Sequence, residues 1–194
     1  PEEQKHHPDS IGQPVLGVEV RIVDLALKDV PQGEPGEILV RCGAPGEITM
    51  MPGYFNRPDD TKSIFVDGWC RTGDMARLGE DGYYYFVDRL KDMIVSGGLN
   101  IYSREVEDAL LTHVAVKEAA VVGVPDAEFG EAVMAFIIPT DATPPTEAAL
   151  IDHCRQHIAS YKKPRHIQFV DTLPRNTTGK VAKHQLRDAV VSSV

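Results

Sequence analysis

One lysine, Lys180, lies at a predicted junction of loop and helix in the stretch LPRNTTGKVAKHQLR, residues 173–187. Proline, asparagine, threonine and glycine precede it, and these residue types favour turns. A phosphate-binding P-loop would need glycine at position 174 and a hydroxyl at position 181. The chain has Pro174 and Val181 there. The stretch is therefore not a P-loop, and by itself it leaves open which reactant the lysine meets.

Two other stretches hold polar side chains that can bind a nucleotide. GWCRTGDMARL presents Asp74 on a predicted Thr-Gly-Asp turn, where a carboxylate can accept two hydrogen bonds from a vicinal diol such as a ribose. An aspartate that only caps its own turn is the alternative, and for this motif alone it is favoured. In VDRLKDM, Asp88 and Arg89 form either a surface ion pair or a site where Arg89 donates to a phosphate or ribose.

The next stretch predicts a hinge and a close approach to a ligand. Lys91 lies where β-rich sequence gives way to mixed α and β sequence, which suits a hinge. Taken alone, it is more simply an exposed lysine. Gly97 and Gly98 form either a plain turn or a piece of backbone that a ligand can approach closely.

Cationic and metal-binding residue types restrict the remaining sites. Lys162, Lys163 and Arg165 in SYKKPRH form a cationic cluster that suits a phosphate, with solvated charge as the alternative. His6 and His7 are neighbours in a polar loop, which indicates solvated side chains rather than metal ligands. No metal site is predicted.

Composition argues against several functions. The formal charge of −9 argues against a general nucleic-acid binder, which would be basic. The three cysteines include no CxxC pair, so neither a zinc site nor a disulfide framework is indicated, and reduced thiols favour the cytoplasm. No apolar run approaches the ~20 residues of a transmembrane helix. The polar first residues resemble no signal peptide, and their abrupt start predicts a piece of a longer protein.

Strand patterns and turns dominate residues 1–88, for which we expect a β-rich subdomain. Residues 18–23 alternate apolar and polar side chains, as a half-buried strand does. Residues 37–41 and 83–87 are apolar-rich and follow glycine-containing turns. A helix start is predicted at Thr61.

Residues 89–194 predict a compact α+β domain. Ser103 is the predicted cap of its first helix, and Thr146 is predicted to open the second. A last helix is expected over residues 181–191. The apolar stripe expected on the first helix comprises Val106, Leu110 and Val114, and the expected strands are 119–124, 132–138 and 167–170.

In their order and spacing, these stretches together resemble the adenylate-forming superfamily of acyl-CoA synthetases, luciferases and peptide-synthetase adenylation domains. GEILVRCGAPGEITMMPGYFNRPDDT is similar to the family's Gly-Glu-Leu…Gly-Tyr…Pro…Thr segment, and GWCRTGD to its Thr-Gly-Asp motif. VDRLKDMIVSGGLNIYSREVE matches the hinge motif and LPRNTTGK the terminal lysine motif. The resemblance covers almost the whole chain. It implies that residues 1–88 end a large N-terminal domain and that residues 89–194 are a mobile C-terminal lid.

The resemblance also implies roles for single residues. Asp74 would bind the ribose hydroxyls of ATP and Arg89 the ribose-phosphate region. Lys180 would contact the carboxylate and the α-phosphate during adenylation, and Lys91 would be the hinge. The implied CoA contacts are Gly97 and Gly98 along the pantetheine, Lys163 and Arg165 at the phosphates, and Phe129 and Tyr161 beside the adenine.

The chemistry of adenylation explains why a lysine is held in a turn. A carboxylate must meet a triphosphate, and like charges ~4 Å apart repel by ~4 kcal/mol at an effective dielectric of 20. A fixed cation offsets this repulsion and stabilises charge that develops in the transition state. Rotation about Lys91 would then withdraw Lys180 and present Gly97 and Gly98, so that CoA can attack the acyl-adenylate.

The implied substrates are ATP, CoA and a carboxylic acid of unpredicted structure. The phosphate loop, the Mg²⁺ ligands and the acid pocket would lie in an N-terminal domain upstream, so this chain alone is expected to be inactive. Ser-Gly-Gly-Leu-Asn-Ile is closer to CoA ligases than to peptide-synthetase domains, and a luciferase-like oxygenase is a poorer match. The alternatives are transfer to another acceptor and a non-catalytic or regulatory relic of the same fold.

Overall fold

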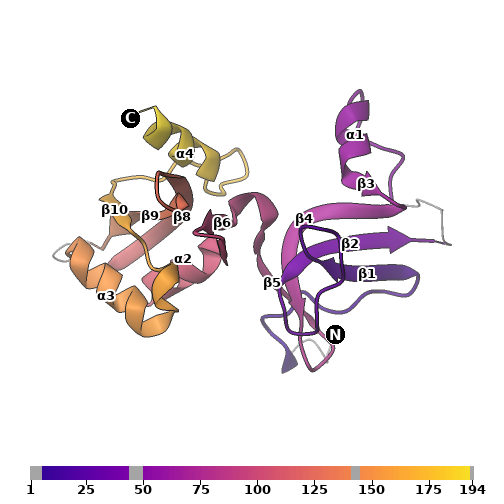
Figure 1. Cartoon of the computed structure of the whole chain (residues 1–194), viewed down its shortest axis with the longest axis horizontal. Helices are drawn as coiled ribbons and strands as arrows, with labels where there is room; N and C mark the ends of the chain where they lie inside the picture. The colour runs from indigo at the N-terminus through magenta and orange to yellow at the C-terminus, as the bar shows by residue number, and fades with distance from the viewer. Residues whose placement is uncertain (1–5, 44–49, 141–144, 193–194) are drawn as a thin grey trace. The chain divides into compact units, whose positions relative to one another are not determined.

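The computed structural model describes residues 6–43, 50–140 and 145–192. The chain divides into two compact units, Pro1–Lys91 and Asp92–Val194. Figure 1 shows the elements of each unit along the chain. Both units combine strands and helices, so the α+β fold class is confirmed.

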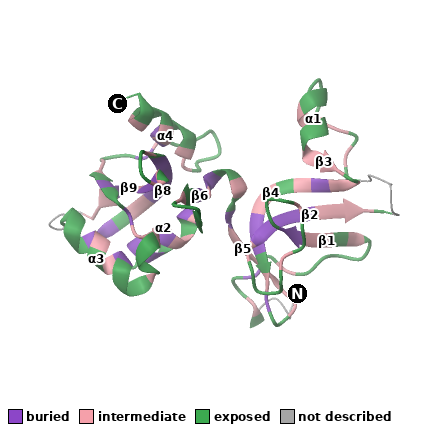
Figure 2. Cartoon of the chain, viewed as in Figure 1, coloured by how far each residue is buried: buried purple, intermediate pink, exposed green. Residues whose placement is uncertain are grey.

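An antiparallel sheet forms the first unit. Its strand order is β1-β2-β4-β3, and β5 also pairs with β4. The helix α1 carries no buried residue, and Figure 2 shows it exposed or half-buried along its length. The elements are β1 (Val18–Val23), β2 (Gly36–Cys42), α1 (Pro58–Ile64), β3 (Phe65–Val66), β4 (Trp69–Leu78) and β5 (Tyr84–Arg89).

The strands predicted near residues 18–23, 37–41 and 83–87 are confirmed as β1, β2 and β5. The helix start predicted at Thr61 is wrong, because α1 begins at Pro58, where proline has no amide to leave unpaired. The Thr61 hydroxyl instead accepts from the backbone N–H of Tyr54 at 2.9 Å and donates to the carbonyl of Arg57 at 2.9 Å. It therefore closes the loop before the helix.

The second unit is a mixed sheet with helices on both faces. Its order is β10-β9-β6-β7, with β8 paired to β9, and β10 runs parallel to β9. A short 3₁₀ turn, Leu90–Asp92, leads into it. The elements are β6 (Ile94–Ser96), β7 (Leu99–Ile101), α2 (Ser103–Leu111), β8 (Val116–Asp126), β9 (Gly130–Pro139), α3 (Glu147–His157), β10 (His166–Phe169) and α4 (Lys183–Val191).

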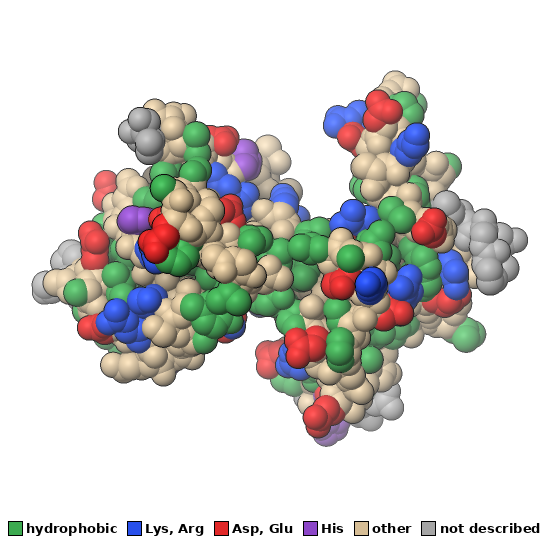
Figure 3. All heavy atoms as spheres, in the orientation of Figure 1, with side chains coloured by type: hydrophobic (Ala, Val, Ile, Leu, Met, Phe, Trp, Pro, Cys, Tyr) green, Lys and Arg blue, Asp and Glu red, His purple; other side chains and the backbone are tan. Residues whose placement is uncertain are grey.

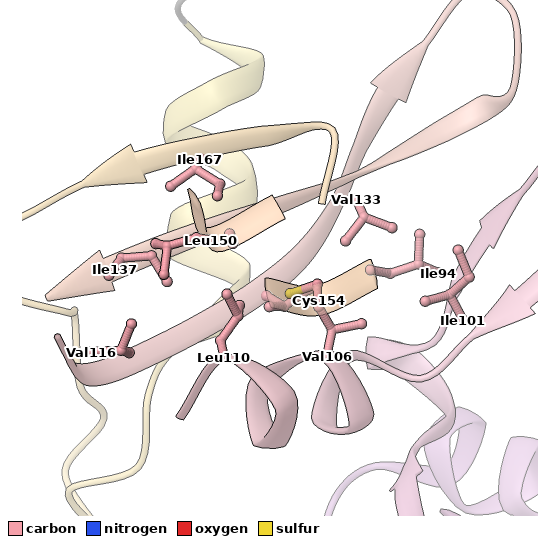
Figure 4. Close-up of a cluster of buried hydrophobic side chains, with 12 residues drawn as sticks. Ile94, Ile101, Val106, Leu110, Val116, Val133, Ile137, Leu150, Cys154 and Ile167 are labelled. Atoms are coloured by element: carbon pink, nitrogen blue, oxygen red, sulfur yellow. The ribbon is translucent and has the colours of Figure 1, made fainter. Parts of the chain in front are cut away.

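Both faces of this sheet are buried, which explains why its central strands are almost continuously apolar. Successive side chains of a strand point to opposite faces. Val121 of β8 joins a cluster with Val106, Leu110 and Leu150 from α2 and α3, drawn in Figure 4. Its neighbour Val122 joins a second cluster, which includes Leu186 of α4. The predicted strands and the last helix are thereby confirmed.

Two details of the predicted helices are corrected. The cap position of α2 is Tyr102, and Ser103 is its first helical residue, completely buried. Val114 is 91% exposed rather than part of the apolar stripe, because α2 ends at Leu111. The predicted start of α3 is confirmed: the Thr146 hydroxyl accepts from the backbone N–H of Ala149 at 3.2 Å.

Candidate functional site

Asp74 lies in a local irregularity of β4 rather than on the predicted turn. Between β2 and β4, Glu37 is opposite Met75 and Leu39 is opposite Arg71. The three residues 72–74 of β4 therefore lie opposite the single residue Ile38 of β2. These extra residues on one strand make β4 bulge. The prediction was wrong because a bulge and a turn use the same Thr-Gly-Asp residue types.

A buried carboxylate holds this bulge in place. Glu37 is 3% exposed, and its oxygens accept from Arg71 Nη2 at 2.6 Å and from the Gly73 N–H at 3.2 Å. The hydrogen bonds to Glu37 raise the pKa of Arg71. On the other side, the Thr72 hydroxyl donates to the Ile38 carbonyl at 2.8 Å and accepts from the Asp74 N–H at 3.1 Å. Sequence reasoning missed Glu37, although an acid directly before the apolar run of residues 38–40 in β2 was a signal.

Asp74 and Arg89 are brought together, as a nucleotide site would need. They are opposite each other on β4 and β5, and Arg89 Nε lies 3.4 Å from Asp74 Oδ1. Both side chains are partly exposed, so their remaining hydrogen-bonding atoms are open to a ligand. Lys91 follows in the turn Leu90–Asp92 and is exposed.

Asn176 orders the backbone around Lys180. Its side-chain oxygen accepts from the N–H groups of Thr178 and Lys180 at 3.0 and 2.9 Å. Its own N–H donates to the carbonyl of Lys180 at 2.8 Å, and Gly179 has the positive φ of +82° that this tight turn requires. The sequence marked Asn176 only as a turn-favouring residue, and the structure adds that its side chain orders the loop. Its signal was an asparagine at the start of a Thr-Thr-Gly turn.

The ends of the same loop are attached to the sheet and to α4. Arg175 pairs with Glu118 of β8 and donates to the Gly179 carbonyl at 2.8 Å. The N–H of Ala182 bonds the Pro174 carbonyl at 2.8 Å. The side chain of Lys180 is exposed, and none of its hydrogen bonds or ion pairs with described residues involves the ammonium group. The loop thus fixes the backbone and leaves the charge available.

Gly97 and Gly98 form the tight turn between β6 and β7. Their φ angles are +58° and +78°, which matches a type I′ hairpin turn, where both central residues need positive φ. The Gly97 N–H donates to the Phe129 carbonyl at 2.8 Å. A Cβ at Gly97 would lie 3.0 Å from the Phe129 ring. Glycine is therefore required at position 97 by conformation and by space.

Arg165 and Phe129 also lie together, in the second unit. The guanidinium carbon is 3.8 Å from the centre of the Phe129 ring. Asp126 shapes this turn, because Oδ1 accepts from the N–H groups of Phe129 and Glu128 at 2.8 and 2.9 Å. These two hydrogen bonds lower the pKa of Asp126. Arg165 therefore presents a cation stacked on an aromatic face, beside the Gly97 turn.

The remaining cations of the predicted cluster point to different partners. Lys162 pairs with Glu105 of α2 at 2.7 Å, so its charge is already compensated. The Lys163 ammonium donates to the Ser160 carbonyl at 2.9 Å, and Tyr161 beside it is exposed. Among the described residues, Arg165 is thus the member of the cluster that stacks on Phe129.

No metal centre or membrane span appears in the part of the chain that the structure describes. Its histidines, cysteines and acids include no group of three or more that could hold a metal ion. His7 instead stacks on Tyr83 and pairs with Asp81 at 2.8 Å. No helix among residues 6–43, 50–140 and 145–192 is long and apolar enough to cross a membrane. On the face shown in Figure 3, cationic and acidic side chains lie next to one another.

Comparison with known proteins gives one family match in each of the two units. Residues 1–55 match the family model of the AMP-binding enzyme, and residues 105–180 match the AMP-binding enzyme C-terminal domain. Residues 1–5 and 44–49 of the first match lie outside the described residues. The chain belongs to the adenylate-forming superfamily, and within it the chain matches the C-terminal part of acyl-CoA synthetases.

Individual relatives agree with this assignment. A long-chain-fatty-acid–CoA ligase of Yersinia pestis is 43% identical over 191 residues, which are 98% of this chain and 33% of the relative. The structure of o-succinylbenzoate CoA synthetase from Bacillus subtilis with its acyl-adenylate intermediate is 36% identical, with a TM-score of 0.83, over 97% of this chain and 37% of that one. An amide bond synthetase from Marinactinospora thermotolerans is 36% identical, with a TM-score of 0.82, over 96% and 37%.

The chain thus spans about a third of the length of the curated relatives it matches. An acid–CoA ligase activates an acid and then transfers it, whereas an amide bond synthetase is named for a different product. The two structures nevertheless resemble this chain equally closely. The comparison therefore identifies the family and leaves the acyl acceptor to the chemistry of the site.

Proposed function

We propose that this chain is the C-terminal part of an AMP-forming acid–CoA ligase. The enzyme activates a carboxylic acid with ATP as an acyl-adenylate and then transfers the acyl group to CoA. The observation that carries this proposal is Lys180: its backbone is tied down by Asn176, while its ammonium is exposed and has no hydrogen-bond or ion-pair partner among the described residues. An ammonium without a partner among the described residues is available to the carboxylate and the α-phosphate.

In the adenylation step, three side chains of this chain act on ATP and the acid. Lys180 stands between the carboxylate and the α-phosphate and offsets their repulsion. Asp74 accepts hydrogen bonds from the ribose hydroxyls. Arg89, 3.4 Å away, orients the Asp74 carboxylate and donates to the ribose-phosphate region. The triphosphate and Mg²⁺ are held by the preceding domain of the enzyme.

In the thioester step, a second set of residues faces CoA. The Gly97-Gly98 turn has no side chain that would block the thiol arm. Arg165, stacked on Phe129, suits a CoA phosphate, because an arginine fork matches phosphate oxygens. Lys163 and Tyr161 are further candidates for the phosphates and the adenine. The chain divides into two units after Lys91. This supports Lys91 as the hinge whose rotation replaces the adenylation residues by the CoA-facing residues.

The acid substrate is proposed from the relatives alone. A long-chain fatty acid is the first candidate, because the curated ligase that is 43% identical is named for it. An aromatic acid is the second, since the o-succinylbenzoate enzyme is 36% identical. Because ATP, CoA and reduced cysteines such as Cys154 belong to the cytoplasm, we expect the enzyme to act there.

Pyrophosphate exchange by the full-length enzyme tests the proposal. Fatty acids of several lengths, aromatic acids and short branched acids are supplied one at a time with ATP and labelled pyrophosphate. We expect exchange with one class and CoA-dependent release of AMP with the same class. The isolated 194-residue chain should show neither activity. Absence of exchange with every acid would favour a non-catalytic relic of the fold.

Transfer to an amine is the second candidate function. It rests on the amide bond synthetase, which is 36% identical over 96% of this chain. The same acyl-adenylate is then offered CoA or a panel of primary amines, and AMP release is measured. Faster release with an amine than with CoA would replace the ligase assignment and keep the adenylation chemistry of Lys180 unchanged.

A further inference from the structure

Asp92, the residue directly after the proposed hinge Lys91, is paired with the helix that follows Lys180. Its Oδ1 lies 2.7 Å from Nη2 of Arg187 on α4. The two side chains are only 12% and 27% exposed, so solvent screens this pair less than an ordinary surface pair. The pair connects the first residue of the second unit to a helix 95 positions later in the chain.

Helix α4 also packs on β8 and contacts α2. It has nine residues, and Leu186 is its buried residue. A helix of this length is marginal by itself and takes its position from tertiary contacts. Near its start, the Lys183 ammonium lies 2.7 Å from Glu107 and 2.6 Å from the Ser103 hydroxyl, both on α2. Lys183 therefore holds the beginning of α4, and Arg187 holds it one turn further on.

These contacts determine where the Lys180 loop stands in the second unit. Lys180 lies three residues before α4 begins, and the other end of its loop is attached through Arg175 to Glu118. Loss of the Arg187 contact would let α4 pivot on Lys183 and Leu186. A shift of about 1 Å in a catalytic group is enough to lower a rate by roughly 100-fold.

We propose that the Asp92–Arg187 ion pair positions Lys180 for adenylation by tying α4 to the first residue after the hinge. Rotation at Lys91 is then transmitted to Lys180 as the movement of one rigid body. Asp92 and Arg187 are positioning residues, since neither needs to touch a substrate. This inference rests on the proposed function, but the tie itself can be measured without any activity.

Hydrogen exchange in the 194-residue chain measures how far the Asp92–Arg187 pair orders the Lys180 loop. Asp92→Asn and Arg187→Gln each break the pair, and Asp92→Arg/Arg187→Asp reverses it. Asp152→Asn is the control, because it breaks an ion pair of the same 2.7 Å length on α3. We expect the amides of residues 176–182 to exchange at least threefold faster in both single variants, and to return toward the wild-type rate in the reversed pair. Unchanged exchange in the single variants would overturn the proposal.

Kinetics of the full-length enzyme then separate positioning from mere stability. We expect each single variant to lower kcat for adenylation about 10- to 100-fold, with KM for ATP changed less than twofold, and the reversed pair to recover most of it. A structural role would reduce the amount of active enzyme and leave kcat per active site unchanged, which would overturn the proposal. A wild-type enzyme without pyrophosphate exchange would refute the proposed function. The hydrogen-exchange rates of residues 176–182 would still show whether the Asp92–Arg187 pair orders the Lys180 loop.

Discussion

Asp74 and Arg89 face each other across β4 and β5, with Oδ1 and Nε 3.4 Å apart. Two charges at this distance, both partly exposed, contribute little to stability. A bulge and a buried glutamate nevertheless shape this pair, which supports the ligand contact that we propose for it. The ribose of ATP is the ligand that the proposed function supplies.

Replacing Asp74 by alanine should weaken ATP binding through the ribose. Hydrogen bonds to a charged group contribute about 1.5–3 kcal/mol, so KM for ATP in the full-length enzyme should rise roughly 10- to 100-fold. With 2′-deoxy-ATP the difference between wild type and variant should shrink, because one hydroxyl partner is already absent. Asp29→Ala, which breaks the Arg21 ion pair elsewhere in the first unit, should leave KM unchanged. Equal losses with ATP and deoxy-ATP would contradict a ribose contact.

Lys180→Ala should slow adenylation alone. One preorganised electrostatic contact is typically worth 10²–10³ in rate, and we expect a loss of that size in pyrophosphate exchange. The thioester step, started from synthetic acyl-adenylate, should be nearly unchanged. Lys117→Ala, an exposed lysine on β8, is the matched control. If both half-reactions of the Lys180 variant fell equally, its role would be structural.

The order of the helices and strands could be predicted because most of them show a clear hydrophobic period or a capping residue. The alternation in residues 18–23 and the Thr146 cap are local signals, and the structure has β1 and α3 at those places. The exposed Val114 and the bulge at Asp74 were missed for one shared reason. Whether the Thr-Gly-Asp run turns or bulges depends on its pairing with β2, and the end of α2 is contacted by His153 of α3 through Thr112. Both partners are distant in sequence.

The candidate site was predictable only as separate motifs. Lys180, Asp74 and Arg89 could be singled out by type and spacing, and the resemblance to a family gave them roles. The residues that hold them in place could not be predicted. Glu37 contacts the Thr-Gly-Asp motif from a neighbouring strand, and Arg187 pairs with Asp92, which lies at the other end of the second unit in sequence. Side-chain contacts of this range leave no pattern in a single sequence.

Glu37→Gln should destabilise the first unit. The buried carboxylate accepts from Arg71 and from the Gly73 N–H, and an amide can replace it only in part. We expect a loss of about 1–3 kcal/mol in the free energy of unfolding. Trp69 is the single tryptophan of the chain and lies in β4, so its fluorescence in urea reports this unit. Glu19→Gln, in a more exposed pair with Arg41, should cost less than about 1 kcal/mol. Equal losses would show that burial at Glu37 is unimportant.

His153 should make the second unit less stable in mild acid. Burial lowers the pKa of His153, and the neighbouring imidazoles of His157 and His113 lower it further, against the opposing hydrogen bond to the Ala109 carbonyl. Folding therefore favours the neutral imidazole. Above the ordinary pKa of about 6.5 its contribution is complete. As the pH falls below that value, the unfolded chain takes up the proton first, and stability declines until the lowered folded pKa is passed.

Hydrogen exchange of α2 and α3 between pH 7.5 and 5, corrected for the intrinsic pH dependence of exchange, checks this decline. His153→Gln should reduce it, because glutamine can still donate to the Ala109 carbonyl that the Nε2–H of His153 contacts at 3.1 Å. His184→Gln, at an exposed position on α4, should preserve it. A decline of the same size in the His153 variant would assign the effect to other groups.

Lys91→Pro should separate the two half-reactions. Proline fixes φ near −65° and disfavours the α region at Leu90, and Leu90–Asp92 is the 3₁₀ turn at which the two compact units divide. A change of orientation there requires large φ/ψ changes at very few residues. One orientation should therefore be lost while each unit stays folded, and we expect the thioester-forming orientation to be the one lost. Rapid-quench measurement of the full-length enzyme should show adenylation preserved and CoA transfer at least 10²-fold slower. The same substitution at Glu147, the first residue of α3, where proline is tolerated, should change neither step. An unaltered overall rate at Lys91→Pro would therefore mean that the rotation occurs at another residue.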